Sequence, residues 1–146
     1  MAQDQYKAGL HHAPGRSLHL PGASHNAPIP AGARVGNILC SSAIAGKDPA
    51  TGELPKDATS QVRNAFGNLR ALLAVGGASL SDVVKLGITI RDNTLREPVN
   101  TEWLACFPDP DDRPARHIVL HDLQHGMWLQ LEVMAVIQQP PQTGNP

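Results

Sequence analysis

The sequence contains few aromatic residues, few cysteines and no excess of either charge, and each shortage excludes a class of protein. Aromatic residues make up 3% of the 146 residues, which leaves little material for stacking nucleic-acid bases. The 12 basic and 13 acidic residues give a net charge of -1, so nothing favours nucleic acid or a membrane surface as a partner. The two cysteines, Cys40 and Cys106, are too few for a disulfide scaffold and suit a reducing compartment.

Long apolar runs and metal-binding motifs are absent as well. No stretch has the roughly 20 apolar residues that a membrane-spanning helix needs. The first residues lack the basic start and apolar run of a secretory signal, so we expect a cytoplasmic protein. The seven histidines form no compact pattern such as H-E-x-x-H, so we expect no metal site.

Glycine and proline divide the chain into three parts. Residues 1–24 show no apolar periodicity and predict an irregular N-terminal arm. Residues 25–138 contain the periodic segments, and their length is typical of one domain with its own core. Two consecutive prolines lie in residues 139–146, which predict a flexible C-terminal tail.

Two segments show the apolar spacing of amphipathic helices. In residues 57–75 apolar side chains recur at steps of three and four. Asp57 or Thr59 is suited to cap the start of this helix, and the glycines at 76–77 to end it. A second helix is predicted for residues 96–107, with Val99, Trp103 and Phe107 along one side.

Four segments have the composition of β-strands. Residues 34–44 predict one strand, followed by a turn, and residues 83–91 predict a strand with strict alternation. Residues 116–121 and 127–137 predict two more, the last of them apolar enough to be buried on both faces. In residues 83–91 one face is fully apolar, formed by Val84, Leu86, Ile88 and Ile90.

The order of strands and helices predicts an α+β fold. A mixed sheet with both helices packed on one face satisfies this order. The other face still has apolar side chains, and soluble monomers rarely leave a large apolar patch in water. We therefore expect the chain to self-associate.

Four segments, taken together and in order, resemble the Rid family, the YjgF-type reactive-intermediate deaminases. They are residues 34–37 (RVGN), 48–54 (DPATGEL), 74–85 (AVGGASLSDVVK) and 113–116 (RPAR). The resemblance covers roughly residues 25–138. It implies a chorismate-mutase-like homotrimer that binds a small carboxylate-bearing substrate at its subunit interfaces. It also implies hydrolysis of enamines and imines, such as 2-aminoacrylate, to a 2-oxo acid and ammonia, without a metal or organic cofactor.

The resemblance assigns the central role to Arg116. It matches the family's arginine that binds the substrate carboxylate, a role that suits the planar, permanently charged guanidinium. The alternative is a structural ion pair with Asp111, Asp112 or Asp122. Ile118 matches the position whose main chain helps to hold the substrate nitrogen and the water. Cysteine is common at that position in the family, so a thiol role is excluded here.

Four further positions complete the implied site. Ser42 matches a pocket serine, although its hydroxyl is equally suited to a bond with nearby main chain. Ile29 stands where the family has a pocket tyrosine. Gln130 stands where it has a water-orienting glutamate, and Glu132 matches a second acidic position. Glutamine can orient a water but cannot accept a proton, so at position 130 this sequence lacks the group that serves as a base in the family.

Histidine is a candidate replacement for that base. His117 and His121 share one side of a predicted strand, but alternation places them opposite Arg116 and Ile118. His25 lies at the start of the first family-like segment. We therefore do not expect His117 or His121 in the cleft of Arg116.

The predicted function is hydrolytic deamination of an enamine or imine of the 2-aminoacrylate or aminomuconate type. The alternative is a non-catalytic trimer that binds a small carboxylate metabolite, retaining Arg116 without the tyrosine and glutamate. A ribonuclease or translation inhibitor, a third function attached to the family, has no support in the balanced charge and sparse aromatics.

Overall fold

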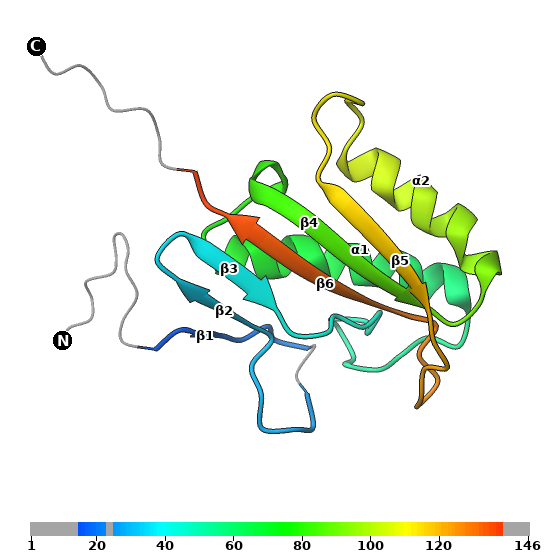
Figure 1. The fold of residues 1–146 in the computed structure, drawn as a ribbon. Coiled ribbons are helices and arrows are strands. Elements are labelled where there is room, and N and C mark those ends of the chain that lie inside the picture. Colours follow the sequence, from blue (N-terminus) through cyan, green and yellow to red (C-terminus); the bar gives the residue numbers. More distant parts are fainter. Residues whose placement is uncertain (1–14, 23–24, 139–146) are drawn as a thin grey trace, which may run out of the picture.

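A six-stranded mixed sheet with two helices on one face forms the part of the chain that this computed structural model describes, residues 15–22 and 25–138 (Figure 1). This confirms the predicted α+β class. Most of the predicted arm and the whole predicted tail lie outside the described residues. Within residues 1–24, Ser17–Leu18 forms a short strand, β1, that pairs with β2. Leu18 is buried, so this stretch contributes to the core.

The segment predicted as one strand is a hairpin, which corrects that prediction. β2 (Gly32–Val35) and β3 (Ile38–Ser41) pair antiparallel, with Val35 opposite Ile38. Gly36, with φ 57°, is the first residue of the two-residue turn between them, the position at which type II′ turns require glycine. The sequence did not reveal this turn, because apolar residues continue on both sides of it and only Gly36 and Asn37 separate the two strands.

The first predicted helix is confirmed as α1 (Ala58–Val75). Its apolar stripe is buried against the sheet, and the Asp57 carboxylate caps it by accepting a 2.8 Å hydrogen bond from the Ser60 N–H. Gly77, with φ 80°, supplies the left-handed residue that follows the helix.

The strand after α1 follows the predicted alternation except at its start. A short 3-10 helix (Leu80–Asp82) leads into β4 (Val83–Ile90), where Leu86, Ile88 and Ile90 are buried as expected. At the first two residues the expectation is wrong: Val83 is 8% exposed and Val84 is 45% exposed. A register shift between Val83 and Lys85 against β6 makes Val84 a bulge residue, which exchanges the two side chains between faces.

The remaining elements match the predicted segments closely. A second 3-10 helix (Asn93–Leu95) leads into α2 (Arg96–Cys106), and β5 (Ala115–Leu120) and β6 (Leu129–Val136) follow. The predicted stripe of α2 is buried, with the rings of Trp103 and Phe107 4.8 Å apart between centroids.

The strand order β1-β2-β3-β6-β4-β5 places β6 in the middle of the sheet and β5 at its edge. β4 and β5 are parallel, and the other neighbours are antiparallel. Both helices lie behind the sheet in Figure 1. We call this side the helix face and the other side the open face. None of the helices in the described ranges has both the length and the apolar character that crossing a bilayer requires.

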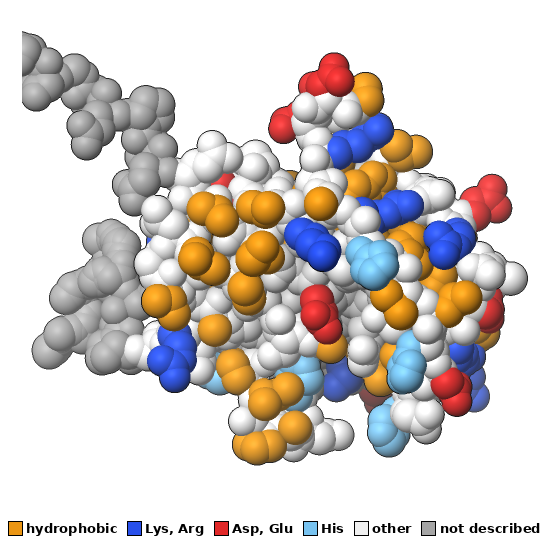
Figure 2. All heavy atoms as spheres, viewed as in Figure 1, with side chains coloured by type: hydrophobic (Ala, Val, Ile, Leu, Met, Phe, Trp, Pro, Cys, Tyr) orange, Lys and Arg blue, Asp and Glu red, His pale blue; other side chains and the backbone are white. Residues whose placement is uncertain are grey.

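The open face is uncovered, which corrects the expectation that β6 is buried on both sides. Buried and exposed residues alternate along β6, with Leu129, Leu131, Val133 and Ala135 on the helix face. Apolar side chains gather on the open face over β3 and β6 (Figure 2). The open-face patch consists of Val35, Ile38, Met134 and Val136, which are 40 to 63% exposed.

Candidate functional site

Arg116 lies on β5 at the edge of the sheet and extends toward α2. Its Nη1 donates a 2.8 Å hydrogen bond to the Asn100 Oδ1, and its guanidinium carbon lies 4.9 Å from the centroid of the Trp103 ring. The pairing of Arg116 with buried Leu86 places its side chain on the helix face. We call Arg116, Asn100, Trp103 and the main chain of Ile118 the edge site.

The charge of Arg116 has no acidic partner. Among residues 15–22 and 25–138 its hydrogen-bond partner is the neutral amide of Asn100, so pairing with Asp111, Asp112 or Asp122 is not found. Partial burial lowers the pKa of Arg116, and the nearby Arg96 cation lowers it further. Both causes act against a charge that no carboxylate among the described residues compensates, so the guanidinium is suited to an external anion.

The main chain of Ile118 is accessible at the same edge. The His121 N–H donates to the Ile90 carbonyl, which fixes the residues of β5 whose main chain faces β4. By alternation the main-chain N–H and C=O of Ile118 point away from β4, and β5 has no neighbour on that side within the described sheet. The Ile118 side chain packs against the core, so only its main chain is available to a ligand.

Arg113, the other arginine of this segment, has a structural role. Its Nε donates to the Phe107 carbonyl at 2.8 Å and its Nη2 to the Pro108 carbonyl at 3.2 Å. These bonds fix the connection between α2 and β5, and thereby the start of the strand that positions Arg116.

A cavity of about 360 Å³ lies at the opposite end of the sheet, beside the start of β6. We call it the histidine cavity. Its walls are mostly apolar, and its polar lining consists of His25, Asn26, Lys47, His125 and Gln130. The apolar side chains of the lining come from α1, from Leu20 and from three segments, residues 27–31, 43–54 and 125–130. They include Ile44, Leu54, Leu72 and Met127.

Gln130 faces this cavity, as the resemblance implies for a water-orienting residue. Its side-chain amide lies 3.4 Å from the Met127 sulfur. His25 contributes a second polar wall, with its Nε2 3.1 Å from the Ala43 carbonyl oxygen. Because a carbonyl only accepts, this nitrogen has the proton, and the other ring nitrogen of neutral His25 is an acceptor.

Ser42 and Ile29 lie at the border of the histidine cavity. The Ser42 hydroxyl donates a 2.8 Å hydrogen bond to the Pro30 carbonyl, which is the main-chain use expected as the alternative to ligand binding. Ile29 is 48% exposed between the lining residues Ala27 and Ala31. Its apolar side chain is therefore available to a partner or ligand outside the cavity.

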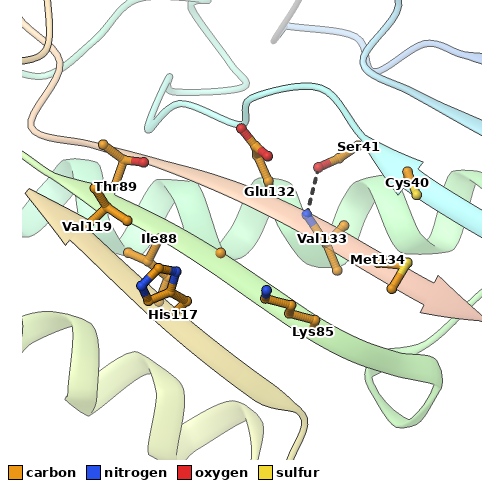
Figure 3. Close-up of a pocket in the computed structure, with 11 residues that line it drawn as sticks. Cys40, Ser41, Lys85, Ile88, Thr89, His117, Val119, Glu132, Val133 and Met134 are labelled. Atoms are coloured by element: carbon orange, nitrogen blue, oxygen red, sulfur yellow. Dashed lines mark hydrogen bonds between the residues drawn. The ribbon is translucent and has the colours of Figure 1, made fainter. Parts of the chain in front are cut away.

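Glu132 lies in a different place, on the open face. There a shallow hollow of about 500 Å³ includes Glu132 on β6, Lys85 on β4 and His117 on β5 (Figure 3). A hydrogen bond of 2.9 Å from the Val133 N–H to the Ser41 Oγ ties β6 to β3 at its margin. The structure thus confirms that His117 lies on the opposite face from Arg116.

The residues expected in one site fall into three separate places within the chain: the edge site, the histidine cavity and the open-face hollow of Glu132. Arg116 pairs with Leu86 and lies on the helix face, whereas Gln130 pairs with Thr89, further along β4, and lies on the open face. Gln130 and Glu132 share a face, as predicted, but line different hollows. Within one chain, Arg116 and Gln130 therefore lie on opposite faces of the sheet.

Asn100, Trp103 and His125 were not anticipated from the sequence. Asn100 and Trp103 stand three residues apart on α2, a spacing that places them on one helix side. That spacing signals a shared face but not which strand the face meets. His125 lies in a loop whose sequence shows no apolar periodicity, so no pattern predicted it as a site residue. In the described part of the chain no group of three or more His, Cys, Asp or Glu is arranged to hold a metal.

Comparison with known families gives one match that covers most of the chain. The sequence model of the family described as Endoribonuclease L-PSP matches residues 25–137. Among curated proteins, the 2-iminobutanoate/2-iminopropanoate deaminase of Escherichia coli K12 is 30% identical over 121 residues, which are 78% of this chain and 94% of that protein. A RutC family protein of Haemophilus influenzae is 30% identical over 105 residues, 70% of this chain and 81% of that protein.

Solved structures give the same result for the fold. RidA from an Antarctic Psychrobacter bacterium superimposes with a TM-score of 0.75 at 27% identity, covering 84% of this chain and all of that one (100%). The YjgF gene product of Escherichia coli superimposes with a TM-score of 0.74 at 26% identity, covering 85% of this chain and 98% of the other.

Proposed function

Because this chain belongs to the Endoribonuclease L-PSP family, which includes the YjgF, RidA and RutC proteins, we propose that it hydrolyses small carboxylate-bearing enamines or imines to an oxo acid and ammonia. The names of its relatives support imine deamination in general. The observation that supports the proposal most is the uncompensated guanidinium of Arg116 in the edge site.

The edge site is suited to a carboxylate. Asn100 fixes one end of the guanidinium through Nη1, and Trp103 lies 4.9 Å from it. The fork of N–H groups then pairs with both oxygens of a carboxylate, a stronger contact than a point charge makes. A substrate held in this way has its reacting carbon next to the main chain of Ile118 at the sheet edge.

We propose that the complete site forms between copies of the chain, in a homotrimer. Two observations support this. Arg116 and Gln130 lie on opposite faces of the sheet, and the open-face patch is of the kind that self-association covers. The edge site of one copy then faces the histidine cavity of its neighbour, with Ser42 and Ile29 at the rim and Glu132 on the shared open face.

The reaction requires a held electrophile and a positioned water. The water oxygen bonds to the imine carbon and one water proton passes to the nitrogen, which gives a carbinolamine. The carbinolamine hydroxyl proton then passes to the nitrogen as well, and the C–N bond breaks to leave the oxo acid and ammonia. Arg116 fixes the carboxylate, the Ile118 main chain holds the nitrogen and the Gln130 amide orients the water. Orientation of this kind supplies a large part of the rate in such additions.

The apolar lining of the histidine cavity favours substrates with an extended carbon chain over 2-aminoacrylate itself. A conjugated acid of the aminomuconate type meets this description. Cys40 and Cys106 are both free thiols, which supports a cytoplasmic place of action.

The test measures ammonia and oxo-acid release from enzymatically generated 2-imino acids and from 2-aminomuconate, against an uncatalysed blank. Wild type and Arg63→Ala, which removes an exposed arginine of α1, are expected to accelerate release. Arg116→Ala is expected to lose most of the acceleration. If well-folded wild type gives no acceleration but binds a 2-oxo acid, the chain is a metabolite-binding trimer and the deaminase proposal is wrong.

A further inference from the structure

The histidine cavity contains the imidazole of His125, which has no role in the proposed reaction. His125 is exposed and lines this cavity together with Gln130. Its φ of 62° makes it the non-glycine residue of the described ranges that adopts a left-handed conformation. Such conformations persist where the surrounding structure enforces them, and they concentrate at functional sites.

The hydrogen bonds that hold the loop of His125 in this conformation come from a buried side-chain amide on α1. Gln61 is fully buried, and its Nε2 donates to the Gly126 carbonyl at 3.0 Å and to the Pro55 carbonyl at 2.7 Å. Its Oε1 accepts a 2.8 Å hydrogen bond from the Trp128 N–H. Gln61 therefore holds the loop on the C-terminal side of His125 and fixes the direction in which the imidazole leaves the main chain.

The other imidazole of the cavity is not available in the same way. Nε2 of His25 is bonded to the Ala43 carbonyl, and its Nδ1 is buried and has no hydrogen-bond partner in the described structure. Both nitrogens of His25 are thus withdrawn from water. His125, by contrast, is exposed and lines the same cavity as Gln130, so its ring is open to water.

We infer that His125 is the proton-transfer residue of the histidine cavity, acting on a water held by Gln130, and that the cavity takes the apolar chain of a 2-imino acid. The inference rests on the proposed function and supplies the base that Gln130 lacks. Gln61 is the positioning residue, since it acts only through the loop.

The proton balance of the step is closed. His125 takes one proton from the water as the water oxygen bonds to the imine carbon and gives it to the nitrogen, which forms a carbinolamine. The carbinolamine hydroxyl then loses its proton, which also passes to the nitrogen through His125, and the C–N bond breaks as the C=O bond forms. The products are the oxo acid and ammonia, with no oxidant or reductant involved. Neutral imidazole is the required form, because a protonated ring has no acceptor for the water proton. The other ionisable groups facing the cavity are His25 and Lys47.

The test compares His125→Gln with His121→Gln, which removes another exposed histidine of the same connection that lines a different hollow. Rates of imine hydrolysis are measured from pH 5 to 8 and corrected for the blank. General-base catalysis contributes on the order of 100-fold. His125→Gln is therefore expected to hydrolyse the imine about 100-fold more slowly than wild type. Its rate is also expected to lack the fall toward acid pH that the wild-type rate shows. His121→Gln is expected to retain both.

A second readout is independent of turnover. In a proton NMR titration of wild type with 2-oxobutanoate, the imidazole signal of His125 is expected to shift and that of His121 to stay. If wild type is active and His125→Gln keeps its rate and acid limb, the inference is wrong and the proposed function stands. If wild type is inactive, the proposed function and the base role both fail, and an unshifted His125 signal overturns the binding role too.

Discussion

Arg116 is bonded to Asn100, 2.8 Å from Nη1 to Oδ1, and not to any carboxylate of the described structure. A neutral partner fixes the direction of the guanidinium without cancelling its charge, whereas an acidic partner would compete with a bound carboxylate. The identity of residue 100 therefore controls whether the edge site accepts an anion.

Asn100→Asp is expected to raise KM for the imino acid at least ten-fold with a smaller effect on kcat, because the new carboxylate forms an ion pair with Arg116. The matched control is Asn93→Asp, since Asn93 Oδ1 accepts a 2.9 Å bond from Arg96 in the same kind of pair. Steady-state kinetics at fixed ionic strength measure both. An unchanged KM in Asn100→Asp would show that Arg116 does not contact the substrate.

Ile38→Asp is expected to dissociate the proposed trimer. Ile38 is 53% exposed in the centre of the open-face patch, so the charge costs little in a single chain but is buried in the assembly. Leu104→Asp, on α2 with 51% exposure, is the control. Light scattering after size exclusion reports the mass, and a monomeric wild type, or a trimer that survives Ile38→Asp, contradicts the proposed assembly.

Gln61→Leu is expected to destabilise the fold by about 2 kcal/mol, because it removes the three hydrogen bonds that the buried Gln61 side chain makes to the Gly126 and Pro55 carbonyls and the Trp128 N–H. Gln124→Leu changes an exposed glutamine of the same loop and is expected to change stability by less than about 0.5 kcal/mol. Urea unfolding monitored by circular dichroism provides both values. Equal midpoints would show that Gln61 does not hold the loop.

The cap of α1 is expected to make stability depend on pH in the acid range. The hydrogen bonds from the Ser60 N–H and hydroxyl lower the pKa of Asp57 below its ordinary value of 3.8. A carboxyl with a depressed folded-state pKa stabilises the fold above the unfolded-state pKa, and the contribution is lost as the pH falls through the folded-state pKa. Asp57→Asn should therefore lower Tm at pH 6 and reduce the decline of Tm below pH 4.

Glu53→Gln, an exposed carboxyl in the preceding turn, is the control for that comparison and should keep the wild-type Tm at pH 6. Differential scanning calorimetry between pH 2.5 and 6 records the profiles. If Tm of Asp57→Asn and Tm of wild type changed in parallel with pH, the cap would make no pH-dependent contribution to stability.

Local elements of this fold were predictable because local rules determine them. The steps of three and four from Val62 to Leu73 predicted α1 and its buried face, and Asp57 was one of two candidates for its cap, with Thr59. Alternation predicted the buried residues of β4 from Leu86 onward. The bulge at Val84 was not predictable, because Val83 and Val84 are identical in type and only the register against β6 distinguishes them.

The sequence placed the candidate site residues on their strands but did not determine how they lie relative to one another. Alternation within β5 placed Arg116 and His117 on opposite faces, as found. The relation between Arg116 and Gln130 depends on β4 lying between β5 and β6, a matter of sheet topology that no periodicity contains. His125 was missed for a similar reason, because Gln61, remote in sequence, holds its loop.

The central claim, that one active site takes Arg116 from one copy and Gln130 from another, is tested most directly by complementation. Arg116→Ala and Gln130→Ala chains with different tags are co-expressed, and mixed trimers are purified and assayed for imine hydrolysis. Each mixed trimer, whichever variant is in excess, has one of its three sites with both residues intact. The account predicts that the mixed trimers exceed the mean activity of the two parent variants; activity equal to that mean would contradict it.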